Sequence, residues 1–223
     1  MKESLRLFNQ RKGEIETYFS FLATITQRGA KIQLNENHHE DIDIDTLHIL
    51  KANGFILLYN LVESCISQAI EDIYQDAIEN EHSYDELKEE IQTELLKYIK
   101  KKDVAELAKA MNSISVDIIK HYPARNDIFS GNLAAKEVKE IGKKYGFSVQ
   151  TNARQTNNGA NLVTIKAKRN DLAHGYISFK DCGKDFPITQ VIEIKQESLL
   201  YIEQILINVA TFIDDKKYLK RDS

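Results

Sequence analysis

The longest helical pattern in the chain is TLHILKANGFILLYNLVESCISQAIEDIYQDAIEN, residues 46–80. Its apolar residues recur at intervals of three and four, which predicts the buried face of an amphipathic helix. That stripe consists of Leu58, Leu61, Val62, Cys65, Ile66, Ala69 and Ile73. The opposite face carries a polar trio flanked by two isoleucines: Ile56, Asn60, Glu63, Ser67 and Ile70. This face is either buried as well, in which case Glu63 needs a polar partner, or it is a solvated face with scattered apolar residues.

Further helical patterns surround this segment. Residues 5–28 and 196–214 are amphipathic, and residues 132–145 form a shorter pattern that ends at Gly146. Ser83 starts another, with Glu86 in the position of a capping box, and Asp103 begins the next. With only 9 Gly and 2 Pro in 223 residues, the chain has too few turn residues for an all-β sandwich.

Short β-strands are expected only late in the chain. Residues 147–151 and 162–166 predict a small β-hairpin insertion before the last helix, joined by a polar loop, and residues 187–194 are also consistent with a strand. The predicted fold is therefore mainly α, a helical bundle with a β insertion at 147–166. It forms a single domain over residues 1–223, in which residues 1–45 supply an N-terminal helix and an acidic loop.

Composition excludes several classes of protein. A net charge of −4 and a pI near 5.9 are not those of a general nucleic-acid coat protein, although residues 160–186 have a net charge of +2. The N-terminus lacks an apolar signal core, and the longest apolar run is far shorter than a membrane span, so we expect a cytoplasmic protein. Two cysteines give neither a disulfide framework nor a zinc set.

Familiar enzyme motifs are missing from the sequence. It contains no P-loop, no GxGxxG, no HExxH, no CxxC and no GxSxG. His38 and His39 stand beside Glu40 and Asp41, but adjacent loop residues rarely converge on one ion. We therefore predict no metal and no cofactor.

The stretch Arg169-Asn-Asp-Leu-Ala-His174-Gly175 combines two groups suited to phosphodiester chemistry. An imidazole exchanges protons near neutral pH, so it can take one from a ribose 2′-OH or give one to a leaving 5′-oxygen. A guanidinium stays charged and offers a planar fork of donors to the phosphate oxygens, where negative charge accumulates. Because RNA supplies its own nucleophile, this reaction requires no metal.

Helix geometry limits how the pair can act. Residues five apart on a straight helix point about 140° away from each other and differ by about 7.5 Å in height. Arg169 and His174 can converge only if the helix ends at His174, as Gly175 permits, or if two chains bring two copies together. In a C2 dimer, two facing motifs would let one imidazole act as base and the other as acid.

This motif resembles the Arg-x4–6-His motif of the HEPN superfamily, whose members often carry a polar residue directly after the arginine, as Asn170 does here. Residues 51–64 (KANGFILLYNLVES) and 129–146 (FSGNLAAKEVKEIGKKYG) also resemble a prokaryotic HEPN branch associated with toxin–antitoxin, restriction and phage-defence loci. Together the similar stretches span about residues 46–212. The resemblance implies an all-α bundle, a dimer with facing motifs, and metal-independent RNA cleavage that leaves a 2′,3′-cyclic phosphate.

Carried over by position, the resemblance makes Arg169 and His174 the catalytic pair and Asn170 a residue that orients or binds the phosphate. Helix phase suggests Glu63 as an ion-pair partner of Arg169, while Asp171 either caps its helix or orients His174. RNA-binding candidates are Lys166, Lys168 and Arg154. The partners expected are an RNA substrate, a second copy of the chain, and an antitoxin or another defence-system protein.

Two other hypotheses remain open from the sequence. The chain could be a non-catalytic HEPN module that binds a nucleotide or a partner protein in the same cleft. It could also be a purely structural helical domain, in which Arg169 is a surface cation and His174 a core residue.

Overall fold

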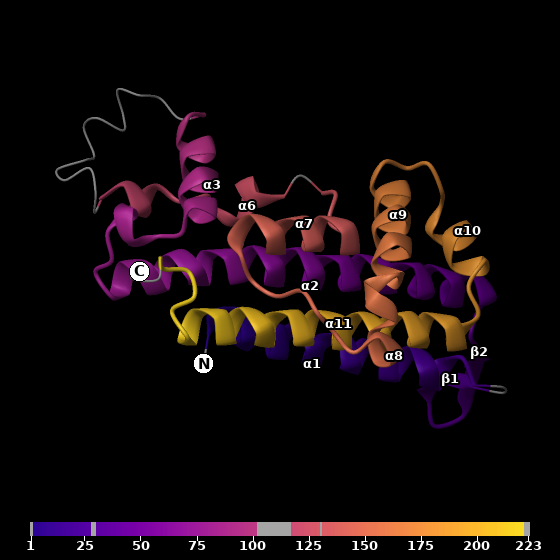
Figure 1. Cartoon of the computed structure of the whole chain (residues 1–223). Helices are drawn as coiled ribbons and strands as arrows, with labels where there is room; N and C mark the ends of the chain where they lie inside the picture. Colours follow the sequence, from indigo (N-terminus) through magenta and orange to yellow (C-terminus); the bar gives the residue numbers. More distant parts are fainter. Residues whose placement is uncertain (1, 28–29, 102–116, 130, 221–223) are drawn as a thin grey trace. The chain divides into compact units, whose positions relative to one another are not determined.

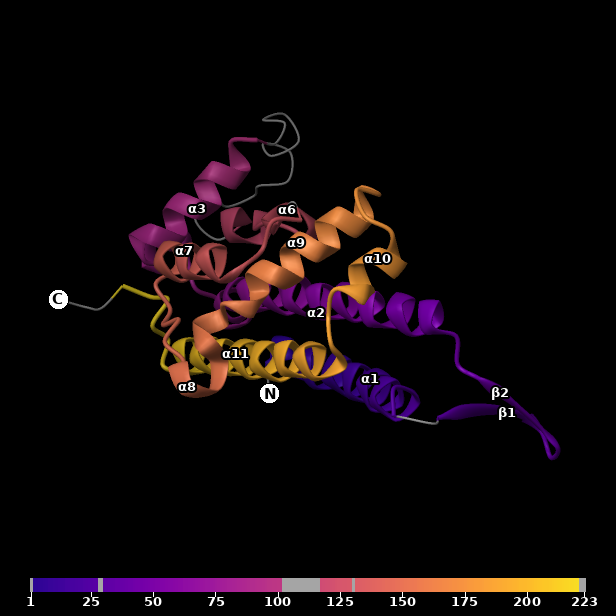
Figure 2. The ribbon, with the colours of Figure 1, turned by 90° about the vertical axis from the view of Figure 1, so that its right-hand side faces the viewer.

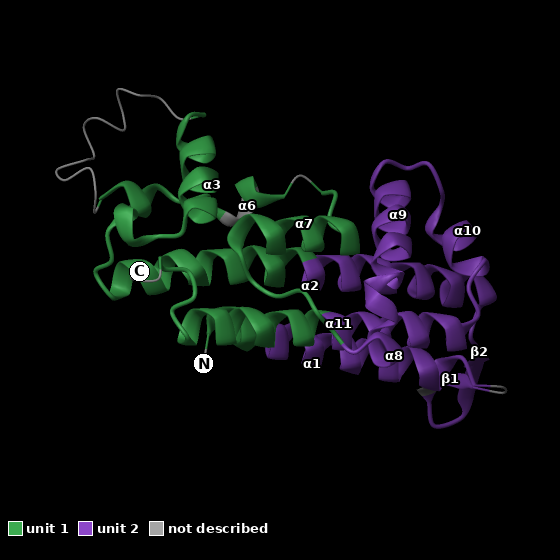
Figure 3. Ribbon diagram, in the orientation of Figure 1, with its two compact units in different colours: residues 1–7, 63–151, 202–223 green, residues 8–62, 152–201 purple. Residues whose placement is uncertain are grey.

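The computed structural model describes residues 2–27, 30–101, 117–129 and 131–220 (Figure 1). The chain divides into two compact units, with residues 1–7, 63–151 and 202–223 in unit 1 and residues 8–62 and 152–201 in unit 2 (Figure 3). Helices α1 (Glu3–Ile25), α2 (Ile44–Glu79) and α11 (Ile188–Asp214) each contribute residues to both units. The mainly helical architecture that the sequence predicts is therefore confirmed.

Unit 2 contains the arginine–histidine motif. Besides its parts of the long helices, it consists of a β-hairpin, β1 (Lys31–Asn35) and β2 (His38–Asp41), followed late in the chain by α8 (Ala153–Thr156), η3 (Asn157–Gly159), α9 (Asn161–Ala173) and α10 (Phe179–Lys184). Figure 2 shows α9 running from α8 toward the loop that leads into α10. Helix α10 lies directly on α2, because a Cβ at Gly183 would be 1.8 Å from the His48 carbonyl oxygen.

Unit 1 holds the remaining short elements. These are η1 (Tyr84–Glu86), α3 (Glu89–Ile99), η2 (Ile118–His121), α6 (Arg125–Ile128) and α7 (Ala135–Tyr145). Ser83 and Glu86 form the predicted capping box. The box begins the short 3-10 helix η1, which ends at Glu86, and α3 starts separately at Glu89. Gly146 ends α7 in the left-handed conformation, as predicted. The helix predicted from Asp103 lies largely outside the described residues.

Helix α2 supplies the core of both units. All seven residues of its predicted apolar stripe are at most 2% exposed. Ser67 and Ile70 on the opposite face are also buried, whereas Asn60 is exposed, so the helix is buried on two sides only in its second half. Its length and composition would suit a membrane span, but 56% of its most apolar window is buried within the protein, as in the core helix of a soluble protein.

The predicted β insertion at 147–166 is wrong. Residues 162–166 belong to α9, where Leu162 and Ile165 are buried at helical spacing and Val163 is exposed. A short apolar run with β-branched residues fits a strand or a helix equally well, so its neighbours decide between them. Residues 147–151 form no strand; this segment lies along α11, with the Gln150 carbonyl oxygen accepting a hydrogen bond of 2.8 Å from the Asn208 amide.

The loop predicted between the two strands has a different role. Asn157, Asn158 and Gly159 all have positive φ (47°, 51° and 75°), which asparagine and glycine tolerate best. They turn the chain from α8 into α9, and the Gly159 backbone sits so close to the Tyr201 ring that a Cβ would be 2.8 Å from it. The Asn-Asn-Gly sequence therefore reverses the chain between two helices.

Two more expectations about strands need correction. Residues 187–194 are not a strand, because α11 begins at Ile188, directly after Pro187, whose fixed φ favours the first turn of a helix. Within the described ranges, a hairpin lies instead at β1 and β2, in part of the segment predicted as an acidic loop. Every residue of β2 is exposed, and its sequence, His-His-Glu-Asp, has no alternating apolar pattern from which a strand could be predicted.

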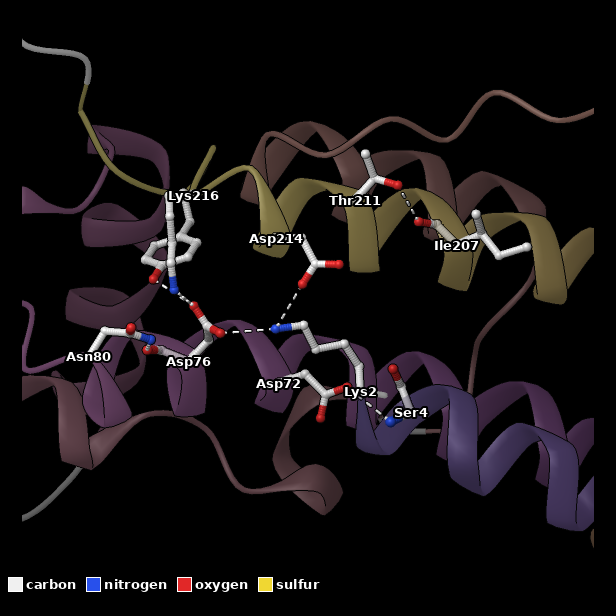
Figure 4. A network of polar contacts seen from close by, with 10 residues as sticks. Lys2, Ser4, Asp72, Asp76, Asn80, Ile207, Thr211, Asp214 and Lys216 are labelled. Atoms are coloured by element: carbon white, nitrogen blue, oxygen red, sulfur yellow. Dashed lines mark hydrogen bonds and ion pairs between the residues drawn. The ribbon is translucent and has the colours of Figure 1, made fainter.

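The mostly buried carboxylate of Asp76 on α2 binds residues from both ends of the chain within unit 1 (Figure 4). It accepts hydrogen bonds from the Lys2 ammonium (2.9 Å), the Lys216 ammonium (2.6 Å) and the Tyr218 hydroxyl (2.7 Å). Lys2 also lies 3.3 Å from Asp214. Burial alone would raise the pKa of Asp76, but the bonds from Lys216, Tyr218 and Lys2 outweigh it, so this pKa lies below its ordinary value.

We expect Asp76→Asn to lower the free energy of unfolding at pH 7 by about 2–4 kcal/mol, because two ammonium groups lose their anionic partner. A carboxyl with a lowered folded-state pKa stabilises the fold above its ordinary pKa, and this stabilisation is lost as the pH falls through the lowered value. The difference between the two proteins should therefore shrink below about pH 4. Urea denaturation at several pH values measures it.

The control is Asp215→Asn, which removes an exposed ion pair with Lys217 (2.8 Å) near the same end of the chain. An exposed pair contributes less than about 1 kcal/mol, so this variant should unfold almost like the parent. An equal loss in both variants would contradict the role of Asp76.

Candidate functional site

The C-terminal end of α9 is closed by a Schellman motif around His174. His174 is the C-cap, and Gly175 follows it in the left-handed conformation, with a φ of +69°. The Tyr176 N–H donates to the Asp171 carbonyl oxygen (2.8 Å), and the Gly175 N–H donates to that of Leu172 (3.2 Å). The helix therefore ends at His174, as Gly175 permits.

Arg169 is half-buried and lies on an aromatic ring. Its guanidinium carbon is 4.6 Å from the centre of the ring of Tyr59, a fully buried residue of α2. Its Nη1 donates a hydrogen bond of 3.0 Å to the side-chain oxygen of Asn170. A cation–π contact and a bond to its neighbour thus hold the guanidinium in place, and its planar fork retains further N–H donors for a phosphate.

His174 is exposed to solvent, so the hypothesis of a core histidine does not fit its position. Its ring centre lies 5.5 Å from that of Tyr176, and the two ring planes are tilted by 30°. Within the described part of the chain, His174 and Arg169 have separate partners and are not bonded to each other. An exposed imidazole and a half-buried guanidinium therefore lie five residues apart near one helix end.

Lys168, a predicted RNA-binding residue, and Asp171, a predicted supporting residue, lie near residues 182–186 in and after α10. The Lys168 ammonium is 5.7 Å from the centre of the Phe186 ring. Burial raises the pKa of the Cys182 thiol of α10, and Lys168 opposes this effect while Asp171 adds to it, so both charges lie near that thiol. Lys166 is half-buried on the same helix. Asp171 contributes its backbone carbonyl to the helix end, and the predicted role of its side chain remains a prediction.

Arg154 lies at the other end of α9. It is exposed in α8, where its N–H donates to the Asn152 side chain (3.1 Å). The 13 residues of α9 separate it from His174, a length of about 20 Å at 1.5 Å per residue. The structure therefore does not bring Arg154 together with the arginine–histidine pair.

Glu63 follows Tyr59 by one turn of α2 and is half-buried. Its ion pair with Arg169 remains a prediction.

Among the described residues, no group of three or more His, Cys, Asp or Glu side chains could hold a metal ion. His38 and Glu40, which the sequence places close together, form a pair of their own at 3.0 Å on the exposed strand β2.

Two tyrosines of the site, Tyr59 and Tyr176, were not predicted from the sequence. Tyr59 lies within the apolar stretch 51–64, where it reads as a core residue, and only the approach of α9 to α2 turns it into a support for Arg169. Tyr176 follows His174 by two residues, and this aromatic residue after the glycine was the only available signal.

A helical bundle with an Arg-x4-His sequence at the end of a helix defines the chain as a HEPN-type domain. Comparison with protein families agrees, since residues 1–218 match the MAE_28990-like HEPN family, and the chain therefore belongs to that family. No curated protein and no solved structure gives a significant match to this chain.

We expect Gly175→Ala to lower the free energy of unfolding by about 1–2 kcal/mol, because a Cβ is strained at positive φ. The neighbouring space is empty, so any loss comes from the backbone conformation itself. The variant should also shift the NMR resonances of the His174 and Tyr176 rings. Gly13→Ala is the control, since Gly13 lies exposed within α1 and alanine favours a helix there by about 1 kcal/mol. A Gly175→Ala protein as stable as the parent would refute this account of the helix end.

Proposed function

We propose that the chain is a metal-independent endoribonuclease that acts in the cytoplasm as a toxin or an anti-phage effector. One observation carries this proposal. A guanidinium held on the Tyr59 ring stands five residues before a solvent-exposed imidazole at the end of the same helix. This arrangement supplies a fixed cation for the phosphate and an accessible group for proton transfer.

The proposed reaction uses the RNA's own 2′-hydroxyl. An imidazole takes the 2′-OH proton, the 2′-oxygen attacks the adjacent phosphorus, and the bond from phosphorus to the 5′-oxygen breaks. A second protonated imidazole gives its proton to the leaving 5′-oxygen, which leaves a 2′,3′-cyclic phosphate and a 5′-hydroxyl. Arg169 stabilises the charge that builds on the phosphate oxygens during the attack.

Two imidazoles require two chains. We infer a homodimer in which the two motifs face each other, so that the two copies of His174 divide the base and acid roles. Asn170 supports this role of Arg169 by accepting its hydrogen bond, which orients the guanidinium. Asp171 helps to close the helix, and Glu63 remains the proposed ionic partner of Arg169.

The cations of α9 suit the flanking RNA. Lys166 and Lys168 lie on the same helix as Arg169 and would contact the phosphates next to the cleaved one. Arg154, about a helix length away, would contact a phosphate further along the strand. An antitoxin or another defence-system protein would control such a nuclease.

We expect His174→Ala to abolish RNA cleavage in a buffer with a metal chelator, whereas the dimer persists in analytical ultracentrifugation. Because the side chain is exposed, its removal should leave the folding stability almost unchanged. The control is His38→Ala on the exposed hairpin, which should cleave like the parent. A His174→Ala protein that still cleaves at the parental rate would disprove the assignment, and an RNA-binding parent that never cleaves would identify a non-catalytic HEPN module.

We expect Tyr59→Leu to lower kcat by about tenfold, because Arg169 loses a ring contact worth about 1–2 kcal/mol. Tyr59→Phe keeps the ring and should retain most of the activity, so the pair separates the ring from the hydroxyl. Circular dichroism checks that both variants fold. Equal rates for the Leu and Phe variants would show that the ring does not support Arg169.

A further inference from the structure

The exposure of Tyr176 is unusual for an aromatic residue. Tyr176 is 79% exposed. Among the large apolar and aromatic residues of the described ranges, the next most exposed is Ile44, at 59%. An aromatic ring left in water is available for a ligand with a flat apolar surface.

The backbone position of Tyr176 is set by the helix end. The N–H of Tyr176 donates to the Asp171 carbonyl oxygen, so the backbone at this residue is part of the Schellman motif. Its ring lies beside that of His174, 5.5 Å between centres, in the range of offset aromatic pairs. Anything that stacks on the free surface of Tyr176 therefore lies next to the imidazole.

We propose that Tyr176 is a stacking platform for one unpaired nucleobase beside the scissile phosphodiester. This inference rests on the proposed ribonuclease function and assigns one base-binding residue to that site. Bases stack on tyrosine through their flat faces, which every base has, so the platform accepts many sequences. A base within a duplex is already stacked and paired, and it cannot reach the ring without leaving the helix.

The charges around the ring fit the same ligand. Arg169 stands on the same helix end and can hold the phosphate of the nucleotide whose base lies on Tyr176. The two contacts together position one nucleotide by its base and by its phosphate, with His174 between them in the sequence. With a net charge of −4, the whole protein attracts RNA only weakly, so a local stacking contact matters more for binding.

The test measures binding separately from cleavage. The probe is a single-stranded oligoribonucleotide with every 2′-hydroxyl methylated and one 2-aminopurine base, which lacks the nucleophile and reports stacking as fluorescence quenching. We expect the parent to quench the probe and Tyr176→Ala to bind it at least about fivefold more weakly, with little quenching. Tyr176→Phe should behave like the parent, and Phe21→Ala, which removes an exposed aromatic ring of α1, should change nothing.

Two further measurements complete the test. Tyr176→Ala should leave the affinity for a duplex of the same sequence unchanged, and with cleavable RNA it should raise KM more than it lowers kcat. Equal affinities of the parent and Tyr176→Ala for the single strand would overturn the proposal. So would a Tyr176→Ala protein with a lower kcat and an unchanged KM, because the ring would then only position His174. Quenching by the parent without cleavage of unmodified RNA would leave the platform intact and reject the nuclease function.

Discussion

A left-handed glycine, Gly175, ends helix α9 directly after His174, and the candidate site depends on this termination. If α9 continued as a helix, residues 174 and 176 would point about 160° apart, and their two rings could not lie side by side. The Schellman bonds stop the helix and turn Tyr176 beside His174. Only glycine has this conformation without strain, so one residue determines where the helix ends.

The other half of the site is built from the core outward. Helix α2 is buried on two sides in its second half, and in its first half it presents the buried ring of Tyr59 to α9. A guanidinium on a buried ring gives up part of its hydration and mobility but keeps its charge and its donors. Contact with a core residue therefore holds Arg169 in place, whereas the position of His174 at the helix end leaves its side chain exposed to solvent. The proposed chemistry needs both properties, since transition-state charge requires a fixed cation and proton transfer requires contact with the substrate.

The sequence predicts the helices that have long periodic patterns and well-defined ends. The apolar stripe of α2, the capping box at Ser83 and the glycine end of α7 all follow from local spacing and local backbone preferences. It fails where a segment is short. Residues 162–166 suit a strand as well as a helix, and the Asn157–Gly159 turn works between helices as readily as in a hairpin, so contacts such as that of Gly159 with Tyr201 decide the outcome.

For the site, the sequence by itself determined the chemical groups and the place where their helix ends, because Arg169, His174 and Gly175 act through local covalent and backbone constraints. The tertiary structure alone decided that Arg169 lies on Tyr59, that Lys168 lies over the ring of Phe186, and that Arg154 stands apart at the far end of α9. These partners lie on different elements or at opposite ends of one helix. Their distances depend on how the helices pack, and no local sequence pattern encodes that packing.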